Sequence, residues 1–557
     1  MIAAYFSSLL LLITGWPTYG YSYDNTRSVP FRQINARNVA ALAPAWKYET
    51  GRYGKFEATP IVVGDAMYLT LPPDDTVVAL DAASGKLKWT YTPKLRPVKL
   101  CCGAVNRGVA VSGGEVFVAT LDARLIALDA RSGKPRWQRA VGPPEHGYSE
   151  TMAPLAWNGM VFIGTSGGDI GMRGSFSAYS ASSGKLLWRW WSVSNGWEGR
   201  YIGRVYGLSL HRDIRREKAL ARKYRDAWKK GGGPVWMTPA LDAARGTLFL
   251  GVGNPWPVVD GEKRPGDNLY TDCVVALDAR TGKMHWYYQE VPHDVWDYDA
   301  ASPPVLLDAI DRSGRRVPAV AEAGKTGFLY VLDRATGALL HRYRGFVPQR
   351  NLFPDVSHGR VLGQPTGGDG VVAPIAYDPV ARQVYVGAMD QWRVAERTDA
   401  YWHVAGQAYP LFTALNLDTG RVRWQLRFDS IGEIDAGINA TAGPLYAGGL
   451  VFWGEEGTGR FLALDPTNGK AVWQFQTEAG YPTGRDRTLR QKLHDFFAPI
   501  KHLLWHELQP QPESHIHNSA IAYVVGGREY IAIGGDSFYR SGSSAGDTLY
   551  VFSLAKR

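Results

Sequence analysis

Two carboxylates stand two residues apart in the segment YYQEVPHDVWDYDAASP, at Asp297 and Asp299. In an extended segment, residues i and i+2 point to the same side, so both carboxylates would face one site. Two such charges repel each other unless a cation or a shared proton lies between them. From residue types alone, such a pair more often lies in a solvated acidic turn, and a metal or acid–base site is the alternative.

The cysteines are few, and two of them are adjacent. Cys102 directly follows Cys101 in LCCGAV, and the third cysteine is Cys273 in YTDCVVALD. Adjacent cysteines can close only a strained ring, so by themselves they indicate packing or metal binding more readily than a disulfide. The odd count excludes a fully paired disulfide scaffold, and the absence of a CxxCH motif excludes a covalently attached c-type haem. Electrons removed from a substrate would have to leave to another protein. Cys273 is expected to be a buried structural thiol.

A recurring phrase predicts the architecture that must position these residues. Each copy reads as a strand, a tight turn at an Asp-x-x-x-Gly-like pattern and a second strand that ends in Trp. Six copies occupy residues 79–89, 127–137, 178–188, 276–286, 414–424 and 463–473, and a degenerate copy, VLDRATGALLHRY, follows Tyr330. Another pair of short strands precedes most copies, which gives four strands per unit. Four-stranded units about 50 residues apart are typical of β-propeller blades, with the Trp of one blade docking on the next.

These seven copies account for seven blades, and the two ends of the chain can supply an eighth. The segments HNSAIAYVVGGREYIAIGGD and DTLYVFSL would contribute three strands, and the N-terminal APAWKYETG would contribute the fourth. Closing the ring in this way removes the exposed edge of an open sheet. The sequence therefore predicts an all-β fold, an eight-bladed propeller closed by its N- and C-terminal strands.

Two stretches that break the period, about 191–233 and 480–517, are predicted to be partly helical insertions over one face.

Composition and charge favour an exported β protein. The chain has 20 Trp, 29 Tyr and 63 Gly with no long polar tract, which argues against disorder. Its net charge of +10 includes a denser basic stretch from Arg212 to Lys230, but no nucleic-acid recognition module accompanies it, and a basic surface suits an acidic protein partner. Residues 1–20 are a candidate signal peptide, although no Lys or Arg precedes their apolar core. No later run approaches the roughly 20 apolar residues of a membrane-spanning helix. We expect residues 21–557 to form one periplasmic domain.

The segments between the repeats narrow the chemistry, which a propeller alone does not imply. They are NTRSVPFRQINARNVAALAPAWKYETG, FEATPIVV, CCGAVNRGVA, GTSGGDIGMRG, GGGPVW, GVGNPWP, PGDNLYTDCVVALDARTGK, PHDVWDYD and GKTGFLYVLDRATG. On these segments, from about Tyr23 to the C-terminus, the chain resembles the quinoprotein alcohol dehydrogenases, the family of bacterial methanol and ethanol dehydrogenases. The resemblance implies a bound pyrroloquinoline quinone (PQQ), one metal ion and the oxidation of an alcohol.

The same resemblance assigns the cofactor site. Cys101 and Cys102 would form a disulfide against one face of the quinone, and Trp236 would cover the other face. The remaining cofactor-binding positions that match are Glu57, Arg107, Thr151, Ser166, Gly167, Gly168 and Lys325. The two cationic side chains in this set suit an anionic quinone, and the turn from Ser166 to Gly168 can offer backbone N–H groups.

The metal site is assigned in the same way. Asp297 matches the family's catalytic base and a metal ligand, and Asp299 matches the extra carboxylate of members that use a lanthanide instead of calcium. The other implied ligands are Asn254 and Asp169, and at the latter position the family usually has Glu. Hard oxygen donors of this kind suit calcium or a trivalent lanthanide and do not suit zinc or copper. Asp299 favours a lanthanide, because a third carboxylate would offset the charge of a trivalent ion, whereas the shorter arm of Asp169 counts against it.

The implied reaction uses the metal as a Lewis acid on the reactive carbonyl of the quinone, while Asp297 accepts the alcohol proton as hydride is transferred. A soluble cytochrome c is the expected electron acceptor, and the oligomeric state stays open, with a homodimer as one alternative. Pro234 and Trp256 depart from the pattern of methanol-oxidising members, so we do not predict methanol as the substrate. Aldehyde or sugar-alcohol oxidation with the same cofactor is an alternative. A non-catalytic scaffold, like outer-membrane assembly proteins with similar repeats, is a hypothesis of another class.

Overall fold

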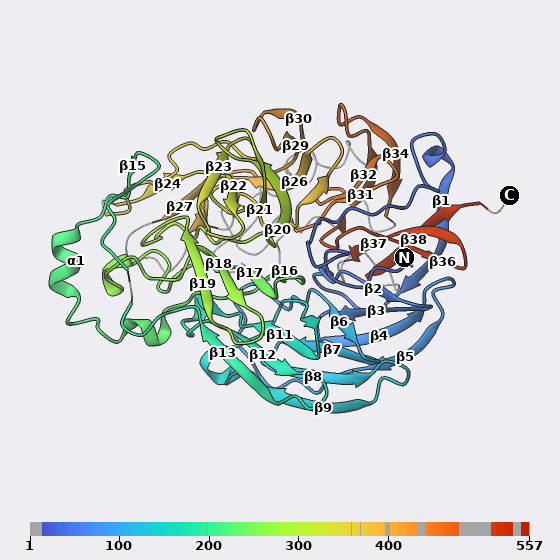
Figure 1. Ribbon diagram of the computed structural model, residues 1–557, viewed down its shortest axis with the longest axis horizontal. Coiled ribbons are helices and arrows are strands. Elements are labelled where there is room, and N and C mark those ends of the chain that lie inside the picture. The colour runs from blue at the N-terminus through green and yellow to red at the C-terminus, as the bar shows by residue number, and fades with distance from the viewer. Residues whose placement is uncertain are drawn as a thin grey trace, which may run out of the picture.

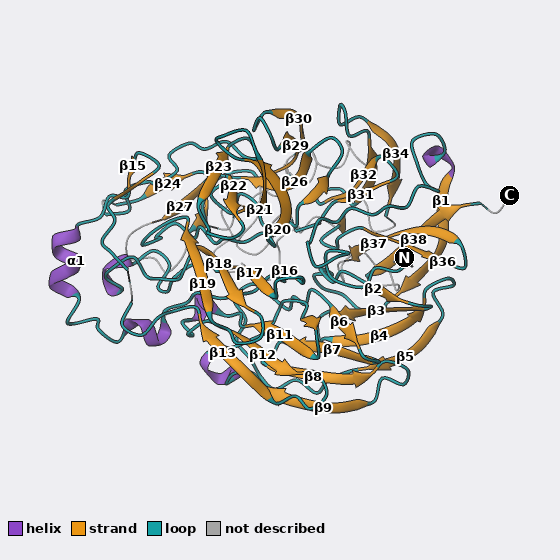
Figure 2. Cartoon of the chain, viewed as in Figure 1, coloured by secondary structure: helices purple, strands orange, loops and turns teal. Residues whose placement is uncertain are grey.

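The computed structural model describes residues 14–197, 199–357, 359–367, 369–395, 402–429, 431, 441–477, 514–537 and 547–555. Antiparallel sheets follow one another around the molecule in chain order, from blue through green and yellow to red, so that the first and last strands lie together (Figure 1). Strands dominate among the described residues, and the helices are short (Figure 2). This is the all-β propeller fold that the repeats predict.

Seven sheets of the described chain contain four antiparallel strands each. The first three are β2 (Ile61–Val63), β3 (Ala66–Leu71), β4 (Thr76–Asp81) and β5 (Leu87–Tyr91); β6 (Val109–Ser112), β7 (Glu115–Thr120), β8 (Arg124–Asp129) and β9 (Pro135–Ala140); and β10 (Leu155–Trp157), β11 (Met160–Gly164), β12 (Ser175–Ser180) and β13 (Leu186–Trp191). The next two are β16 (Ala240–Asp242), β17 (Thr247–Gly251), β18 (Cys273–Asp278) and β19 (Met284–Gln289); and β20 (Val305–Ile310), β21 (Arg316–Ala323), β22 (Leu329–Asp333) and β23 (Leu339–Tyr343). The last two are β25 (Ala376–Asp378), β26 (Gln383–Asp390), β29 (Tyr409–Asn416) and β30 (Val422–Arg427); and β31 (Leu445–Ala447), β32 (Leu450–Glu455), β33 (Arg460–Leu464) and β34 (Ala471–Gln476).

An eighth large sheet joins the two ends of the chain. It contains β1 (Leu42–Glu49), β38 (Thr548–Leu554), β37 (Arg528–Ser537), β36 (Ile521–Val525) and β35 (Ser514–His515). The N-terminal strand β1 pairs antiparallel with the C-terminal strand β38, from Leu42 opposite Leu554 to Glu49 opposite Thr548. Two small sheets lie outside this series: β14 (Arg204–Val205) with β15 (Leu208–Ser209), and β24 (Val361–Gly363) with β27 (Arg393–Ala395) and β28 (His403–Val404).

The repeat Trp residues link consecutive sheets. Each indole N–H donates a hydrogen bond to a backbone carbonyl of the following repeat or strand: Trp89 to Ala130 (3.0 Å), Trp137 to Ala181 (2.8 Å), Trp188 to Ala279 (3.1 Å), Trp286 to Arg334 (3.2 Å), Trp424 to Pro466 (2.9 Å) and Trp473 to Leu42 (3.0 Å). The ring also lies over the turn glycine of the next copy, where a Cβ on Gly133 would fall 2.5 Å from Trp89. In the degenerate copy, Tyr343 covers Gly420 in the same way.

This contact predicts the effect of a single methyl group. Gly133→Ala should lower the free energy of unfolding by about 3 kcal/mol, because the new Cβ meets the Trp89 ring and the backbone has φ +70°. Gly159→Ala is the matched control, since φ is +73° and nothing lies within 4 Å of its Cβ, so it should cost only about 1 kcal/mol. Denaturant unfolding measures both variants. Equal losses would mean that the ring contact contributes nothing.

The insertion at 191–233 is partly helical, as predicted. It carries the hairpin β14–β15, the helix α1 (Ile214–Leu220) and a 3₁₀ turn at Ala227–Lys230. Asp213 caps α1, because its side chain accepts a hydrogen bond from the Arg216 N–H (2.9 Å). Most of the second predicted insertion, 480–517, lies outside the described residues.

The end of the candidate signal peptide belongs to the packed structure. Trp16 is fully buried, and its backbone N–H and C=O both bond to Val62 (2.9 Å each). Thr14 accepts a hydrogen bond from the Val524 N–H (2.6 Å). These contacts place part of the segment before residue 21 in the packed structure, and the boundary at residue 20 stays a prediction. Among the described residues, no helix is long and apolar enough to cross a membrane.

Candidate active site

One cavity collects every site residue that the sequence predicted. Its lining includes Glu57, Cys101, Cys102, Arg107, Thr151, Ser166, Gly167, Gly168, Asp169, Trp236, Asn254, Asp297, Asp299 and Lys325. These positions come from five of the four-stranded sheets or the loops that precede them, so the fold brings together residues far apart in the sequence.

Strand polarity explains why these loops meet. Some of the residues come after the second strand of a sheet, as Asp169, Asn254 and Lys325 do. Others lie in the connection that leads into the first strand, as Arg107 and Asp297 do. In an antiparallel sheet the second strand ends where the first strand begins, so both kinds of loop lie at the same end of the sheet. A ring of such sheets therefore directs all of these loops to one face.

Three carboxylates and one ammonium group form the floor of the site. Lys325 Nζ lies 2.9 Å from Asp297 Oδ1 and 2.5 Å from Asp299 Oδ2. The Asn254 side-chain amide donates to Asp169 Oδ1 (2.9 Å), and its backbone N–H donates to the Asp299 carboxylate. The predicted metal ligands thus converge on one another, with Lys325 among them.

The charge of this group fits a hard cation. Burial raises the pKa of Asp297 well above its ordinary value despite Lys325, and burial together with Asp299 raises the pKa of Asp169. Burial lowers the pKa of Lys325, but Asp297 and Asp299 outweigh it and the pKa lies well above the usual value. Three carboxylates against one ammonium leave an excess of negative charge in a buried place, which is costly unless a cation balances it. Carboxylate and amide oxygens are the donors that calcium and lanthanide ions prefer.

The loop that carries Asp297 is held in a specific conformation. Asp297 has φ +67°, the left-handed region that a non-glycine residue seldom adopts. The Asp294 carboxylate accepts the N–H groups of Trp296 (2.8 Å) and Tyr298 (2.9 Å), on either side of Asp297. The Tyr298 hydroxyl donates to the Pro365 carbonyl (2.6 Å). These bonds fix the direction of the Asp297 carboxylate into the cavity.

A second wall of the cavity carries a chain of polar contacts. Arg107 Nη2 pairs with Glu57 Oε2 (2.8 Å), and its Nη1 donates to the Thr151 hydroxyl (3.0 Å). The Thr151 and Ser166 hydroxyls lie 2.7 Å apart. The Arg107 guanidinium also lies over the Trp236 ring, 4.9 Å from its centroid. This wall offers a cation, hydroxyls and an aromatic face, as binding of a planar anionic cofactor requires.

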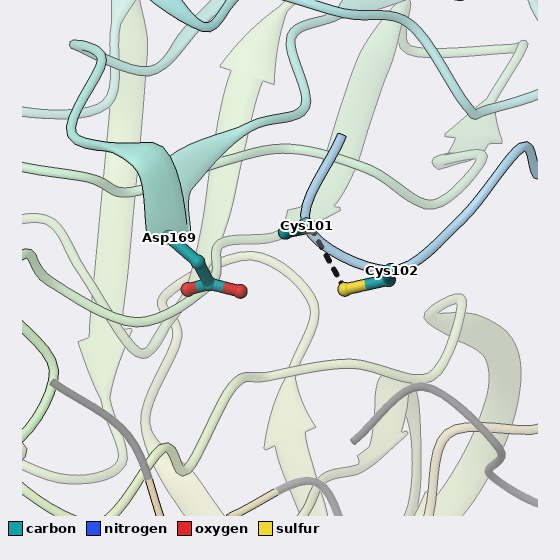
Figure 3. A group of neighbouring side chains, drawn as sticks. All are labelled: Cys101, Cys102 and Asp169. Carbon is teal, nitrogen blue, oxygen red and sulfur yellow. Dashed lines mark hydrogen bonds between the residues drawn. The ribbon is translucent and has the colours of Figure 1, made fainter. Parts of the chain in front are cut away.

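The adjacent cysteines open onto the same cavity. Figure 3 shows Cys101 and Cys102 facing the carboxylate of Asp169, and the ligand atoms of all three lie within 4.8 Å of one another. The two sulfur atoms are 2.8 Å apart, longer than the roughly 2.05 Å of a disulfide bond, and both cysteines are free thiols here. The disulfide implied by the family resemblance stays a prediction.

Comparison with known proteins decides the family. Residues 16–357 match the model of the glucose/ethanol/alcohol dehydrogenase β-propeller domain of PQQ enzymes. The chain belongs to the PQQ-dependent alcohol dehydrogenase family. It is therefore an oxidoreductase rather than the non-catalytic scaffold considered above, although residues 390–495 match the model of the outer membrane protein assembly factor BamB.

Individual relatives of this PQQ-dependent dehydrogenase cover most of the chain. A quinohemoprotein alcohol dehydrogenase, ADH IIB of Pseudomonas putida, is 30% identical over 97% of the chain and 77% of its own length. A lanthanide-dependent methanol dehydrogenase of Methylorubrum extorquens is 31% identical over 82% of both proteins. The solved structure of a europium-containing methanol dehydrogenase superposes with a TM-score of 0.73 at 26% identity, covering 97% of this chain and 98% of that one.

Several lining residues of the dehydrogenase were missed from the sequence. Apolar walls come from Leu100, Val105, Val258, Val372 and Trp402, and further lining comes from Gly103, Ser149, Gly367 and Thr441. Pro234, singled out from the sequence, also lines the cavity. Trp402 is buried, and its indole N–H donates to the Val295 carbonyl (3.1 Å). Trp256, singled out from the sequence, is not among the described lining residues, whereas Val258 is. No spacing pattern marks these residues, because distant loops bring them to the cavity.

Two buried acids behind the site were also missed. Glu290 and Glu322 are almost fully buried. They lie close to the site, because a Cβ added to Gly324, the residue before Lys325, would be 3.1 Å from Glu290 Oε2 and 2.9 Å from the Asp299 carbonyl oxygen. Burial raises the pKa of Glu322 to about 8, and burial together with its partner raises that of Glu290 well above its usual value. The pair is therefore protonated at least once near neutral pH. Cys273, as predicted, is a fully buried thiol at the start of β18.

This pair predicts a pH-dependent stability. The pKa of an unfolded glutamate is about 4.5, so the folded protein binds the Glu322 proton more tightly than the unfolded chain does. The stability that this proton contributes is fully present below pH 4.5 and is lost as the pH rises towards about 8. Glu322→Gln should remove most of this loss, on the order of 3 kcal/mol between pH 5 and 8. Denaturant unfolding at several pH values measures the slope, with the exposed Glu145→Gln as control. Parallel curves for wild type and Glu322→Gln would contradict the prediction.

Proposed function

We propose that this dehydrogenase oxidises a primary alcohol to an aldehyde in the cavity described above, with PQQ and one metal ion bound there. The observation that carries the proposal is the convergence on one cavity of all the cofactor and metal positions that the family resemblance implies. We further propose that the protein works in the periplasm and that a soluble cytochrome c accepts the electrons, since the chain itself has no CxxCH motif.

Each wall has a separate task in this proposal. Arg107, Thr151 and Ser166 would hold the polar edge of the quinone, Trp236 would cover one face, and Cys101 with Cys102 would lie against the other as a disulfide. The bound cofactor and metal supply the hydride acceptor and its Lewis-acid activation. The metal would be held by Asp169, Asn254, Asp297 and Asp299, whose oxygen donors suit that ion.

Asp297 is the base in this proposal. Its carboxylate lies at the cavity, and Lys325, 2.9 Å from Oδ1, orients it and stabilises its charged form. The alcohol would bind beside it, so that the hydroxyl proton passes to Asp297 while the carbon-bound hydrogen leaves as hydride. Leu100, Val258 and Trp402 form an apolar surface that would hold the alkyl group and exclude water.

The ion in this proposal is a lanthanide. Asp299 adds a third carboxylate beside Asp169 and Asp297, and this extra negative charge would offset the higher charge of a trivalent ion. A trivalent ion is also the stronger Lewis acid. The similarity to a lanthanide-dependent relative supports this choice.

The proposal also includes the architecture of the ring. We propose eight blades, the eighth built from β36, β37, β38 and β1, with each repeat Trp docking on the next blade. The indole hydrogen bonds and the pairing of β1 with β38 support it. A closed ring would hold the loops of all blades rigidly around one cavity.

Reconstitution tests the function. The purified apoprotein is mixed with PQQ and either calcium or lanthanum, and ethanol-dependent reduction of an artificial dye is followed. Turnover with lanthanum and little turnover with calcium is the expected result. If neither metal gives turnover and no quinone absorbance stays with the protein after gel filtration, the proposed activity is wrong. Turnover with calcium alone would instead overturn the choice of ion.

A further inference from the structure

A strong concentration of positive charge lies in the insertion, outside the cavity. The stretch from Arg212 to Lys230 contains nine Lys or Arg and three Asp or Glu, so it supplies six of the chain's net charge of +10. The reaction uses none of these cations. In Figure 1 the helix α1, which carries part of this stretch, projects at the edge of the molecule.

Five of these cations form what we call the basic face: Arg215, Lys218, Arg222, Lys223 and Lys230. All five are exposed, and within the described chain no carboxylate forms an ion pair with any of them. Neighbouring cations are already paired, Arg216 with Glu262 (2.7 Å) and Lys229 with Asp226 (2.9 Å). The basic face also includes a shallow hollow, lined by Ala219, Arg222, Lys223, Arg225 and Asp226.

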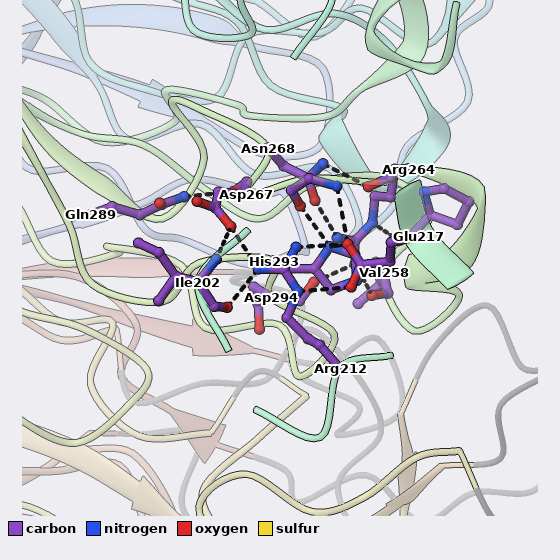
Figure 4. A network of polar contacts seen from close by, with 12 residues as sticks. Ile202, Arg212, Glu217, Val258, Arg264, Asp267, Asn268, Gln289, His293 and Asp294 are labelled. Carbon is purple, nitrogen blue, oxygen red and sulfur yellow. Dashed lines mark hydrogen bonds and ion pairs between the residues drawn. The ribbon is translucent and has the colours of Figure 1, made fainter. Parts of the chain in front are cut away.

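The segment that carries the basic face is anchored to the core. The Arg212 side chain is buried and pairs with Glu217 (2.7 Å) in α1 and with Asp267 (2.6 Å) (Figure 4). The Glu217 carboxylate accepts the Gly266 N–H (3.1 Å), and His293 Nδ1 bonds to the Gly266 carbonyl (2.7 Å). Because these contacts are buried, the exposed cations are presented from a fixed base rather than from a free loop.

The same segment ends against the loops that carry two metal ligands. After Lys230, the Gly231 carbonyl accepts the Trp256 N–H (3.0 Å), and the Gly233 N–H donates to the Asn254 carbonyl (2.8 Å). The segment also contacts the loop of the other ligand, because the Gly232 N–H donates to the Met172 carbonyl (2.9 Å), and Met172 is three residues after Asp169. A short path of covalent and hydrogen bonds therefore runs from the proposed metal site to the start of the basic face.

We propose that the basic face is the docking surface for a soluble electron carrier whose own surface is acidic. The proposal rests on the proposed function, in which a soluble cytochrome c accepts the electrons. Unpaired exposed cations attract an acidic partner from a distance and raise the rate of encounter, and the hollow offers a place for its carboxylates. The anchored segment would then bring the carrier to the bonded path that leads to the site.

Charge reversal separates docking from catalysis. The variant Lys218→Glu, Arg222→Glu and Lys223→Glu is compared with a control that makes the same charge change at exposed turn lysines, Lys86→Glu, Lys134→Glu and Lys185→Glu. Reconstituted proteins oxidise ethanol with either an acidic soluble cytochrome c or phenazine ethosulfate as acceptor. For the cytochrome, kcat/KM should fall about 10- to 100-fold in the first variant at low ionic strength and by much less in the control. The wild-type rate should fall steeply between about 10 mM and 0.2 M salt, and the variant rate should not.

The dye reports on the chemistry alone. Its reduction should stay within about twofold of wild type in both variants, because a small acceptor needs no docking surface. Equal losses in the two variants, or an unchanged cytochrome rate in the first, would overturn the proposal. Loss of binding to phosphatidylglycerol vesicles with unchanged cytochrome reduction would also overturn it, in favour of a membrane contact. If wild type reduces neither acceptor, the proposed function fails instead.

Discussion

Asp297→Asn is expected to lower kcat by about 10²- to 10⁴-fold, which is the usual contribution of a general base. Asn keeps an oxygen atom at nearly the same place, so it can still ligate a cation and occupy the volume of the carboxylate. It cannot accept the alcohol proton at neutral pH, and it removes the charge that pairs with Lys325 at 2.9 Å. The change therefore separates the proton-accepting role of Asp297 from its role in holding the site together.

Stopped-flow or steady-state dye reduction measures kcat, and bound metal and quinone absorbance are measured on the same samples. The prediction requires that both cofactors stay bound while turnover is lost. The matched control is Asp294→Asn, a change in the same loop. The Asp294 carboxylate accepts the N–H groups of Trp296 and Tyr298, and Asp294 is not among the residues that line the cavity. A kcat within about threefold of wild type in Asp297→Asn would exclude this residue as the base.

Asp299→Ala is expected to abolish most of the lanthanum-supported activity, by about 100-fold or more, with a smaller loss of any calcium-supported activity. Asp299 is 3% exposed, lies 2.5 Å from Lys325 Nζ and accepts the Asn254 N–H. Without its charge the site has one carboxylate fewer to balance a trivalent ion, whereas a divalent ion needs less. Removing one partner of a buried charge pair also leaves Lys325 less well compensated.

Asp299→Asn distinguishes these two effects, because it keeps an acceptor for the Asn254 N–H and removes only the charge. Metal titrations followed by quinone absorbance give the affinity for lanthanum and for calcium in each variant. We expect both variants to lose lanthanum affinity in parallel with activity. Full activity of Asp299→Ala with lanthanum would show that this carboxylate does not select the ion.

Asp169→Glu, which introduces the residue usual in the family, should strengthen binding of the ion in the same metal titrations.

The sequence by itself determined the class of fold and the candidate site. The repeat, with a glycine turn and a final Trp, predicts four-stranded units about 50 residues apart, which are typical of a propeller. The site residues were assigned by resemblance, because segments such as CCGAVN and WDYD match the quinoprotein family in type and order.

The tertiary structure decided which distant residues meet. It placed Lys325 between Asp297 and Asp299, lined the cavity with Val258 and Trp402, and buried Glu290 with Glu322 behind it. It also packed Trp16, within the candidate signal peptide, into the core. None of these contacts has a spacing signal, because each joins segments that lie well apart in the sequence, and the geometry between such segments depends on how the strands and sheets pack rather than on any one segment.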